Sequence, residues 1–427
     1  MTQRLVARAA ALRGTIHVPS DKSIGHRALL ANAIAEGEAE VRLRAPGADL
    51  ESTIGCLVAL GGRIRRRGAA IEVRGARLEP PRAALDCGNS GTTMRLLAGL
   101  LAGQPVDAVL DGDDSLSSRP MERVAAPLRA MGARVSTTDG HAPIEIRGGA
   151  LRATDHELPV ASAQVLGAIA FAALGGEGDT TVRLPGPTRD HTERLLAWMG
   201  VRIRRKGTVT TISGPARPAA RSLDVPGDPS SAAAWLVAAA LHRDADLLLP
   251  GVCLNPTRLA ILDVLREMGA TVDVEERAAD GPEPVGDLRV RSGDRLRPIS
   301  VGGPDVAALI DELPLLGVAM AAADGVSELR DAGELRVKES DRIAAMVAGL
   351  HAIGADVEEL PDGWRVRPGL SQDAEITTRG DHRIGIAFAV AALTGVAGTV
   401  RIDDAESASV SYPGFWADLD AIAAVPA

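Results

Sequence analysis

The sequence predicts an α/β (α+β) protein of two similar lobes, each built from three copies of one repeated unit. The unit recurs six times along the 427 residues, at a period of roughly 70 residues. The first and fourth copies begin alike, with HVPSDKS and DVPGDPSS, and the segment before Pro19 has no copy of its own. Repetition of one unit of helices and strands lets each copy pack against its neighbours.

Each copy begins with a polar turn that leads into an alanine-rich helix. The turns and helices read PSDKSIGHRALLANAIAEG, CGNSGTTMRLLAGLLAG, ASAQVLGAIAFAALGG, GDPSSAAAWLVAAALHR, IDELPLLGVAMAAADG and GDHRIGIAFAVAALTG. A second helix ends in LVALGGRI, LRAMGARV, LAWMGVRI, LREMGATV and LHAIGADV. Glycine after the last apolar position, followed by a β-branched run, is typical of a helix end that leads into a strand. The sixth copy is degenerate, because FWADLDAIAAV runs into the C-terminus.

The division into two sets of three copies predicts the lobe boundaries. We expect residues 20–227 to form one lobe and residues 228–427, with residues 1–19, to form the other. The chain would then cross between lobes near residues 19 and 227, and the active site would lie in the cleft between them. The alternative is one continuous solenoid, which is less favoured because solenoid repeats have about 20–45 residues and plain capping ends.

Composition excludes several classes of function. A net charge of −9 with 2% aromatic residues provides neither the basic face nor the stacking platform of a nucleic-acid-binding protein. No apolar run approaches the roughly 20 residues that span a bilayer. The start, MTQRLVARAAALRG, lacks the apolar region of a secretory signal, so we expect a cytoplasmic protein. Cys56, Cys87 and Cys253 are too widely separated to indicate a disulfide framework or a zinc site.

Lysine is nearly absent, since only Lys22, Lys206 and Lys338 among the 47 basic residues are not arginine. An ammonium group can give up its proton, whereas a guanidinium group stays charged. Lys22 and Lys338 lie in polar turns and are therefore candidates for catalytic residues. The alternative is that they remain as lysine only through random sequence drift. Lys206, in RIRRKG, is typical of a solvated strand end.

The polar turns lie at helix N-termini, where unpaired N–H groups attract phosphate or carboxylate. If three such helices per lobe run in the same direction, their N-termini converge on one face. The turns and two connecting loops contribute Lys22, Ser23, Arg27, Asn89, Ser90, Gly91, Thr92, Arg95, Arg119, Ser162, Gln164, Asp311, Lys338, Glu339, Arg342, Asp381, His382 and Arg383. A cation at a positive helix end is unfavourable without an anion, so Lys22 and Arg383 indicate a bound anion. Ser90, Thr92 and Ser162 have ordinary N-capping as an alternative.

Asp311 and Glu339 are the carboxylates that we consider as acid and base. Asp311 precedes a helix with Glu312 beside it, so N-capping by either residue is the alternative. Glu339 lies between Lys338 and Arg342, so a plain ion pair is its alternative.

Gly91 and His382 each have two interpretations. The missing side chain of Gly91 leaves room for a small ligand near the backbone, although a tight turn also explains it. His382 is either a proton carrier or a cap.

Nine motifs in order resemble those of the 5-enolpyruvylshikimate-3-phosphate synthase family, and they cover nearly the whole chain. They are PSDKSIGHR, GNSGTTMR, SLSSRPM, SAQ, RDHTE, NPTR, IDELP, RVKESDR and GDHR. The resemblance implies two lobes of three βαβαββ units each, the inside-out α/β barrel of enolpyruvyl transferases. It implies transfer of the enolpyruvyl group of phosphoenolpyruvate to the 5-hydroxyl of shikimate 3-phosphate, with release of phosphate, in aromatic amino acid biosynthesis. No metal or organic cofactor is implied, and we expect a monomer without nucleic-acid or membrane partners.

The resemblance also implies roles for individual residues. Contacts to shikimate 3-phosphate are expected from Lys22, Ser23, Arg27, Ser162, Ala163, Gln164, Asp311 and Lys338. Contacts to phosphoenolpyruvate are expected from Lys22, Gly91, Arg119, Gln164, Arg342 and Arg383. Asp311 should take the proton of the attacking hydroxyl, and Glu339, with Lys22 nearby, should handle the proton at the methylene carbon.

Some positions depart from the family pattern. Val410 precedes the segment SYP where some members have lysine, so one phosphoenolpyruvate contact is missing or replaced. RDHTE and NPTR match the glyphosate-tolerant subgroup, whereas Leu166 and Asp114 stand where that subgroup has lysine. Sensitivity to glyphosate is left open, although Gly91 keeps the space that a tolerant side chain would fill.

Two other functions are possible alternatives. The related transferase that acts on UDP-N-acetylglucosamine has a cysteine in the loop that here reads DDSLSSRPM and an asparagine where Ser23 follows Lys22. A non-catalytic anion-binding scaffold would keep the repeats, but the intact Asp311, Glu339 and Lys338 argue against it. No G-x-S-x-G or Walker pattern supports a serine hydrolase or a nucleotide hydrolase.

Overall fold

The computed structural model describes residues 2–423, and the chain divides into two compact units. Unit 1 consists of Met1–Pro19, Pro226–Ala279 and Pro284–Ala427. Unit 2 consists of Ser20–Val225 together with the short segment Asp280–Glu283. No helix within residues 2–423 is both long and apolar enough to cross a membrane.

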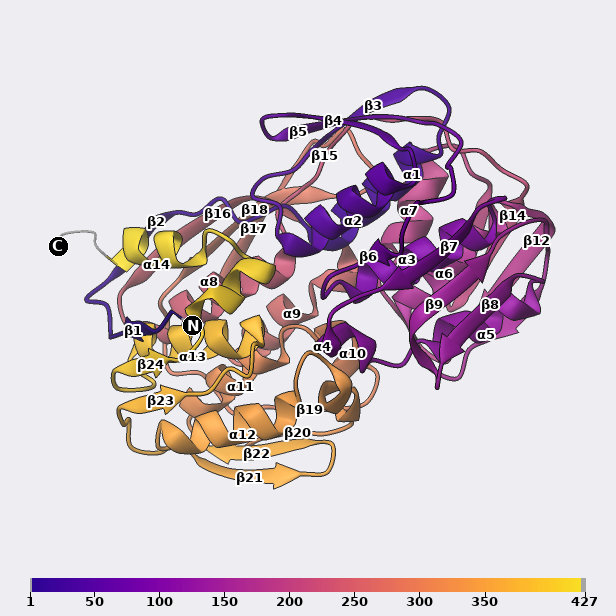
Figure 1. Ribbon diagram of the computed structural model, residues 1–427. Helices are drawn as coiled ribbons and strands as arrows, with labels where there is room; N and C mark the ends of the chain where they lie inside the picture. The colour runs from indigo at the N-terminus through magenta and orange to yellow at the C-terminus, as the bar shows by residue number, and fades with distance from the viewer. Residues whose placement is uncertain (1, 424–427) are drawn as a thin grey trace. The chain divides into compact units, whose positions relative to one another are not determined.

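Unit 2 contains three small sheets and the helices that accompany them (Figure 1). The first set is α1 (Lys22–Ala33), β3 (Glu38–Arg42), α2 (Ala48–Ala59), β4 (Arg63–Arg67), β5 (Ala70–Arg74) and β15 (Leu223–Asp224). The second is β6 (Leu85–Asp86), α3 (Gly91–Ala102), β7 (Asp107–Asp111), α4 (Asp114–Ser117), α5 (Glu122–Ala130), β8 (Arg134–Thr138) and β9 (His141–Arg147). The third is β10 (Leu151–Arg152), β11 (Asp155–Glu157), α6 (Ala163–Ala173), β12 (Gly176–Arg183), α7 (His191–Trp198), β13 (Ile203–Lys206) and β14 (Val209–Gly214).

Unit 1 repeats the same pattern. Its first set is β2 (Leu12–Thr15), α8 (Pro229–Leu241), β16 (Ala245–Cys253), η1 (Pro256–Arg258), α9 (Ala260–Glu267), β17 (Thr271–Arg277) and β18 (Val285–Arg291). The second is β19 (Ser300–Val301), α10 (Asp305–Leu309), α11 (Leu313–Ala322), β20 (Ser327–Leu329), η2 (Gly333–Val337), α12 (Arg342–Ala352), β21 (Asp356–Leu360) and β22 (Gly363–Arg367). The third is β23 (Ala374–Ile376), α13 (His382–Thr394), β24 (Val400–Ile402), η3 (Ala405–Val410), α14 (Phe415–Ala423) and β1 (Arg4–Val6).

Strand order is the same from sheet to sheet. The orders β15-β3-β5-β4, β6-β7-β9-β8, β10-β12-β14-β13, β2-β16-β18-β17 and β19-β20-β22-β21 each begin with a parallel pair and continue with two antiparallel pairs. The remaining sheet is β23-β24-β1, in which the N-terminal strand pairs antiparallel with β24. The degenerate sixth copy therefore obtains this strand from the start of the chain.

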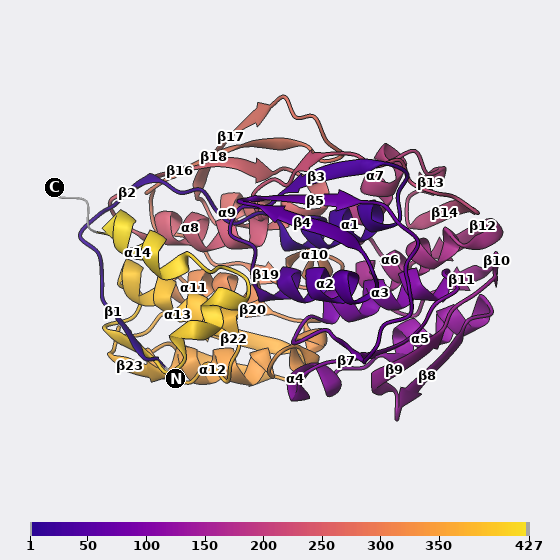
Figure 2. The same cartoon turned by 45° about the horizontal axis from the view of Figure 1, so that its top comes forward.

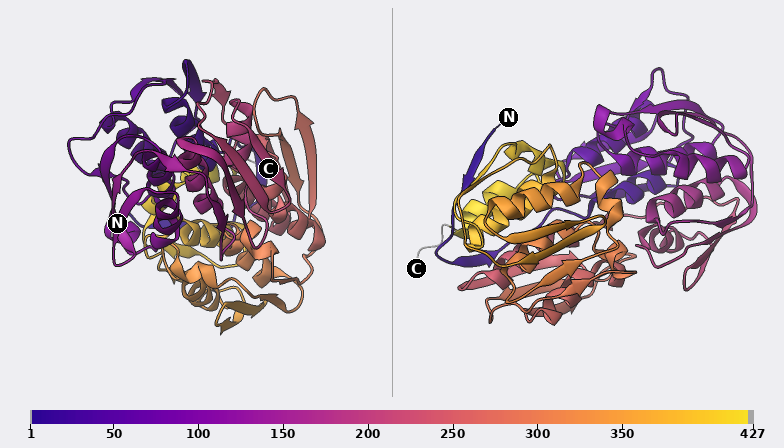
Figure 3. Two further views of the ribbon diagram at one scale, coloured as in Figure 1. Left: turned by 90° about the vertical axis from the view of Figure 1, so that its right-hand side faces the viewer. Right: turned by 90° about the horizontal axis from the view of Figure 1, so that it is seen from below.

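The alanine-rich helices of each unit pack closely against one another. In unit 2, a β-carbon at Gly99 of α3 would lie only 2.0 Å from the carbonyl oxygen of Ala168 in α6, so these helices meet backbone to backbone. In unit 1, α13 is buried along its whole length, as an all-round apolar helix requires. Sheet β3-β5-β4 lies over α1 and α2 in Figure 2, and the right-hand view of Figure 3 shows the yellow and orange helices of unit 1 against its strands.

The second helix of each copy ends where the glycine pattern predicted. The glycines of LVALGGRI, LRAMGARV, LAWMGVRI, LREMGATV and LHAIGADV that follow the helices all have positive φ, at 77°, 103°, 91°, 104° and 93°. Residues with a β-carbon avoid this backbone region, so glycine ends the helix at low cost. The prediction of repeated units with glycine helix ends is confirmed.

Candidate active site

Most alanine-rich helices begin with a capped N-terminus. Asp21, Ser90 and Ser162 accept the backbone N–H groups of Ile24, Thr93 and Val165 at the starts of α1, α3 and α6. Asp228 and Asp381 cap α8 and α13 in the same way. The capping alternative thus holds for Ser90 and Ser162. It does not hold for Thr92, which lies inside α3 and accepts a hydrogen bond from Gln164 at 3.0 Å.

Arg342 is the centre of a charged cluster in unit 1. Its side chain is 1% exposed, and Nε lies 2.8 Å from Oδ2 of Asp381 while Nη2 lies 2.5 Å from Oε2 of Glu339. Burial acts to lower the pKa of Arg342, but the carboxylates of Asp381 and Glu339 outweigh it and raise that pKa above its usual value. The ion-pair alternative for Glu339 therefore holds, and its partner is a guanidinium group with a fixed charge.

Asp311 lies beside the same cluster. Its Oδ1 atom is 3.5 Å from Nη2 of Arg383 and 3.9 Å from Nη1 of Arg342, and its backbone carbonyl accepts a hydrogen bond from Nη1 of Arg383 at 2.8 Å. No side-chain cap bond is present at the start of α11, where Glu312 occupies the N-cap position. The capping alternative for Glu312 is therefore wrong. The Asp311 carboxylate instead faces two arginines.

Lys338 and His382 complete the predicted residues of unit 1. Partial burial lowers the pKa of Lys338, and the nearby carboxylates of Asp311 and Glu334 oppose that effect. The side chain is 27% exposed, so its ammonium group keeps access to solvent. His382 is the first residue of α13 and is buried.

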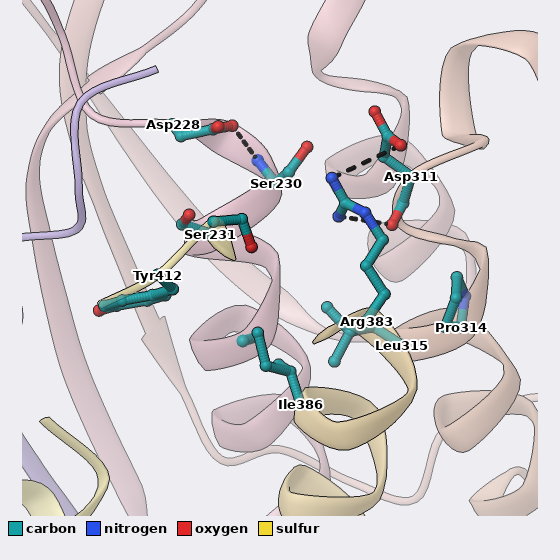
Figure 4. Close-up of a pocket in the computed structure, with 11 residues that line it drawn as sticks. Asp228, Ser230, Ser231, Asp311, Pro314, Leu315, Arg383, Ile386 and Tyr412 are labelled. Carbon is teal, nitrogen blue, oxygen red and sulfur yellow. Dashed lines mark hydrogen bonds and ion pairs between the residues drawn. The ribbon is translucent and has the colours of Figure 1, made fainter. Parts of the chain in front are cut away.

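A pocket opens at the N-termini of α8, α11 and α13 within unit 1 (Figure 4). Its polar lining comes from Asp228, Ser230, Ser231, Asp311, Arg383 and Ser411, and Leu315, Ile386 and Tyr412 form part of its apolar lining. Figure 4 shows the guanidinium group of Arg383 reaching Asp311 on one side of the pocket, opposite Ser230 and Ser231. Two carboxylates, a guanidinium group and several hydroxyl groups thus line one cavity.

Lys22 in unit 2 is the first residue of α1. Its Nζ atom lies 3.1 Å from Oδ2 of Asp49 on α2, and both side chains are partly exposed. The backbone carbonyl of Asp49 accepts a hydrogen bond from Thr93 of α3 at 3.3 Å. The starts of α1, α2 and α3 are thereby linked around the ammonium group.

Arg27 is buried one turn into α1. Nε donates to Oγ1 of Thr192 at 2.6 Å, and Nη1 donates to the backbone carbonyl of Ser23 at 2.9 Å. Burial lowers the pKa of Arg27 to about 10, and the charges of Glu193 and Asp21 oppose that shift. A pKa of about 10 leaves the guanidinium charged at neutral pH.

Gly91 stands between two arginines at the start of α3. A β-carbon there would lie 2.9 Å from Nη1 of Arg95 and 3.5 Å from Nη1 of Arg119. Arg95 donates to Oε1 of Gln164 at 2.5 Å, and Arg119 donates to Oδ1 of Asn89 at 2.5 Å. Two guanidinium groups, one from α3 and one from the loop after α4, therefore lie around a position without a side chain. Ala163 begins α6, next to Gln164.

Comparison with known proteins identifies the family. The family model described as EPSP synthase (3-phosphoshikimate 1-carboxyvinyltransferase) matches residues 6–419. The chain belongs to the EPSP synthase family. The 3-phosphoshikimate 1-carboxyvinyltransferase of Roseiflexus castenholzii is 51% identical over 415 residues, which is 95% of this chain and 96% of that protein. The protein of the same name from Chloroflexus aurantiacus is 49% identical over 419 residues, 96% of each chain.

A solved structure supports the same conclusion for the fold. EPSP synthase from Acinetobacter baumannii superposes with a TM-score of 0.88 at 38% identity, covering 99% of this chain and 98% of that one. The resemblance found from the nine motifs and the predicted fold class, two lobes of an inside-out α/β barrel, are both confirmed.

Several residues in these clusters were not singled out from the sequence. Asp49 pairs with Lys22, and Thr192 holds Arg27, in contacts that join distant parts of the chain. Glu283 contacts Nδ1 of the buried His191 at 2.6 Å, although it lies in the loop between β17 and β18. The RDHTE motif was the one available signal, since it contains His191 and Thr192.

Proposed function

We propose that the charged clusters of both units act on one pair of anionic substrates, phosphoenolpyruvate and shikimate 3-phosphate. Membership of the family of 3-phosphoshikimate 1-carboxyvinyltransferases supports the reaction. In that reaction the enolpyruvyl group of phosphoenolpyruvate is transferred to the 5-hydroxyl of shikimate 3-phosphate, and inorganic phosphate leaves. The reaction serves aromatic amino acid biosynthesis.

The charged cluster of unit 1 is the main support for this proposal. Asp311, Lys338, Glu339, Arg342 and Arg383 come from three separate motifs, yet they form a single cluster in unit 1. The two substrates bring about six negative charges together. A close ion pair contributes up to about 4 kcal/mol at an effective dielectric constant near 20, so several fixed cations offset the repulsion between the reactants.

The residues divide between the two substrates. Shikimate 3-phosphate is held by Lys22, Ser23, Arg27, Ser162, Ala163, Gln164, Asp311 and Lys338. Phosphoenolpyruvate is held by Lys22, Arg119, Gln164, Arg342, Arg383 and the backbone of Gly91. The hydrogen bonds of Arg119 and Arg342 to Asn89 and Glu339 support this division, because they fix the guanidinium groups before the substrate arrives.

Proton transfers follow from the two carboxylates. The Asp311 carboxylate takes the proton of the 5-hydroxyl as its oxygen attacks C2 of phosphoenolpyruvate, while Glu339, with Lys22 nearby, delivers a proton to C3. A tetrahedral ketal results. Removal of a proton from the new methyl group and loss of phosphate restore the double bond. Phosphate is therefore released only after the addition.

The site has no lysine at Val410, and Ser411 lines the pocket beside Arg383. Ser411 can donate a hydrogen bond to an anion but supplies no charge. We therefore assign to Arg342 and Arg383 the charge compensation that a lysine at this position provides elsewhere in the family.

Three finer proposals concern the protein as a whole: it acts as a monomer, it works in the cytoplasm, and glyphosate inhibits it. The space beside Gly91, where a β-carbon would meet Arg95, supports inhibition by a small anionic molecule. Inhibition by glyphosate should weaken as phosphoenolpyruvate is raised, which a titration of initial rates measures.

Phosphate release tests the proposed reaction directly. We expect phosphate from phosphoenolpyruvate only when shikimate 3-phosphate is present, and no release when UDP-N-acetylglucosamine replaces it. Release without any acceptor, or absence of release with both substrates, would overturn the proposal.

A further inference from the structure

Four buried polar side chains of unit 1 form a hydrogen-bonded network, and two of them, Asp228 and Ser230, also line the pocket. Nη2 of Arg258 donates to Oγ of Ser230 at 2.7 Å and to Oδ1 of Asp228 at 3.0 Å. The same Asp228 oxygen accepts the backbone N–H of Ser230 at 2.8 Å. The hydroxyl of Ser230 in turn donates to Oε1 of Glu312.

The direction of these hydrogen bonds is fixed by chemistry. A guanidinium group only donates and a carboxylate only accepts, so the Ser230 hydroxyl must accept from Arg258 and donate to Glu312. The side chain of Arg258 is 1% exposed, and Glu312 is likewise 1% exposed. Burial of charges at this depth is costly unless they are paired and hydrogen-bonded, and loss of the hydroxyl would remove one hydrogen bond from the buried Glu312 carboxylate.

The network ends at the peptide bond that carries Asp311. Glu312 occupies the N-cap position of α11, but its side chain is bonded to Ser230 of α8 rather than to its own helix. On the other side of that peptide bond, the carbonyl of Asp311 accepts from Arg383 of α13 at 2.8 Å. The Asp311–Glu312 peptide is therefore held from α8 and from α13 at once.

We propose that Ser230 and Arg258 are positioning residues for the Asp311 carboxylate. They hold Glu312 and, through its peptide bond, keep Asp311 against Arg383. This inference rests on the proposed role of Asp311 as the group that takes the hydroxyl proton. Displacement of a reacting group by about 1 Å can cost about 100-fold in rate, so a network that fixes the position of Asp311 has a kinetic effect.

A double-mutant cycle separates this inference from the proposed function. Ser230→Ala should lower kcat by about 10- to 100-fold and leave KM for both substrates within about threefold of the parent. In the Asp311→Asn background the same substitution should change kcat by less than about twofold, because the residue that it positions no longer acts as a base.

Other outcomes of the double-mutant cycle would overturn either the positioning role of Ser230 or the base role of Asp311. An equal loss of kcat from Ser230→Ala in both backgrounds would overturn the positioning role and leave the role of Asp311 intact. A kcat of Ser230→Ala within about twofold of the parent value would also overturn the positioning role. If Asp311→Asn itself keeps the parental kcat, the proposed base is wrong, and that result is visible from the single variant alone.

Stability needs its own control, because Ser230 is buried. Ser327 is also buried in unit 1, and its hydroxyl accepts the backbone N–H of Ile299 at 3.2 Å rather than a group of the network. Ser327→Ala should lower the melting temperature without lowering kcat. If Ser230→Ala does not yield folded protein, Arg258→Lys goes through the same cycle, since it keeps the charge but replaces the planar guanidinium group whose Nη2 donates to Ser230 and Asp228. Equal losses of kcat in both backgrounds would again overturn the inference.

Discussion

Arg342 and Asp381 form an ion pair in which the arginine side chain is 1% exposed and the aspartate side chain 0% exposed, with Nε and Oδ2 separated by 2.8 Å. Asp381 also caps α13 by accepting the N–H of Arg383 at 3.0 Å. The pair thus joins the KESDR motif at the start of α12 to the GDHR motif at the start of α13. Two helix N-termini and two proposed substrate-binding arginines depend on it.

Loss of this pair should be costly for folding. Arg342→Ala leaves the buried Asp381 carboxylate without its main partner, so we expect the free energy of unfolding to fall by about 3–5 kcal/mol. Arg365→Ala is the matched control, because Arg365 pairs with Glu328 and Glu358 at the surface and should change stability little. Denaturant unfolding measures the free energy of unfolding of both variants. Equal stability of the two variants would contradict the account.

His26 should make stability depend on pH. It is buried in α1 with Nδ1 2.7 Å from Oγ1 of Thr53, and burial lowers its pKa to about 3. Its pKa in the unfolded chain is about 6.5, so the contribution is complete above that pH and is lost as the pH falls from 6.5 toward 3. We expect a slope of about 1.4 kcal/mol per pH unit, seen as the difference between parent and His26→Gln in denaturant unfolding.

The exposed His351 provides the control for that series. His351→Gln should leave the pH dependence of unfolding as it is in the parent. A parent and a His26→Gln variant with parallel profiles between pH 7.5 and 5 would show that the imidazole has the same pKa in the folded and unfolded chains, which would contradict the account.

Gly91→Ala should impair phosphoenolpyruvate binding while the fold is retained. The new methyl group would lie 2.9 Å from Nη1 of Arg95 and so displace that guanidinium from Gln164. We expect KM for phosphoenolpyruvate to rise about tenfold and inhibition by glyphosate to weaken, with KM for shikimate 3-phosphate nearly unchanged. Gly55→Ala is the control, because no atom lies within 4 Å of a β-carbon at that position. It should leave the KM values for phosphoenolpyruvate and shikimate 3-phosphate unchanged. An unchanged KM for phosphoenolpyruvate in Gly91→Ala would show that Gly91 is not part of the phosphoenolpyruvate site.

Lys22→Arg tests whether the rarity of lysine has chemical meaning. Arginine keeps a positive charge near Asp49 but cannot give up a proton. Turnover should therefore fall by at least about tenfold without a comparable loss of stability. Lys206→Arg, at the end of β13, should have no effect on turnover. Full activity of Lys22→Arg would mean that only the charge matters at this position.

The sequence predicted the repeated units well because each boundary has a local physical cause. Glycines with positive φ end the second helices, and aspartate or serine caps begin most of the first helices. Short elements such as α10 have no comparable signal, and the pairing of β1 with β24 joins opposite ends of the chain. Local patterns do not encode such distant partners.

The same distinction applies to the site. Motifs indicated Lys22 and Arg383 because a cation at a helix N-terminus is unfavourable without an anion. They indicated Asp311 and Glu339 because carboxylates in these turns can act as acid and base. They did not indicate that Asp49 would pair with Lys22, or that Glu312 would bond to Ser230 instead of capping its helix. Such contacts depend on how separate helices pack.

The central claim is that cations of both units bind the same anionic substrate. Equilibrium binding of phosphoenolpyruvate in the presence of shikimate 3-phosphate, measured for Arg119→Ala of unit 2 and Arg383→Ala of unit 1, tests it most directly. Removal of one partner of a buried, hydrogen-bonded charge pair costs about 2–5 kcal/mol, so each variant should bind at least about tenfold more weakly than the parent. Parental affinity in either variant would contradict the account.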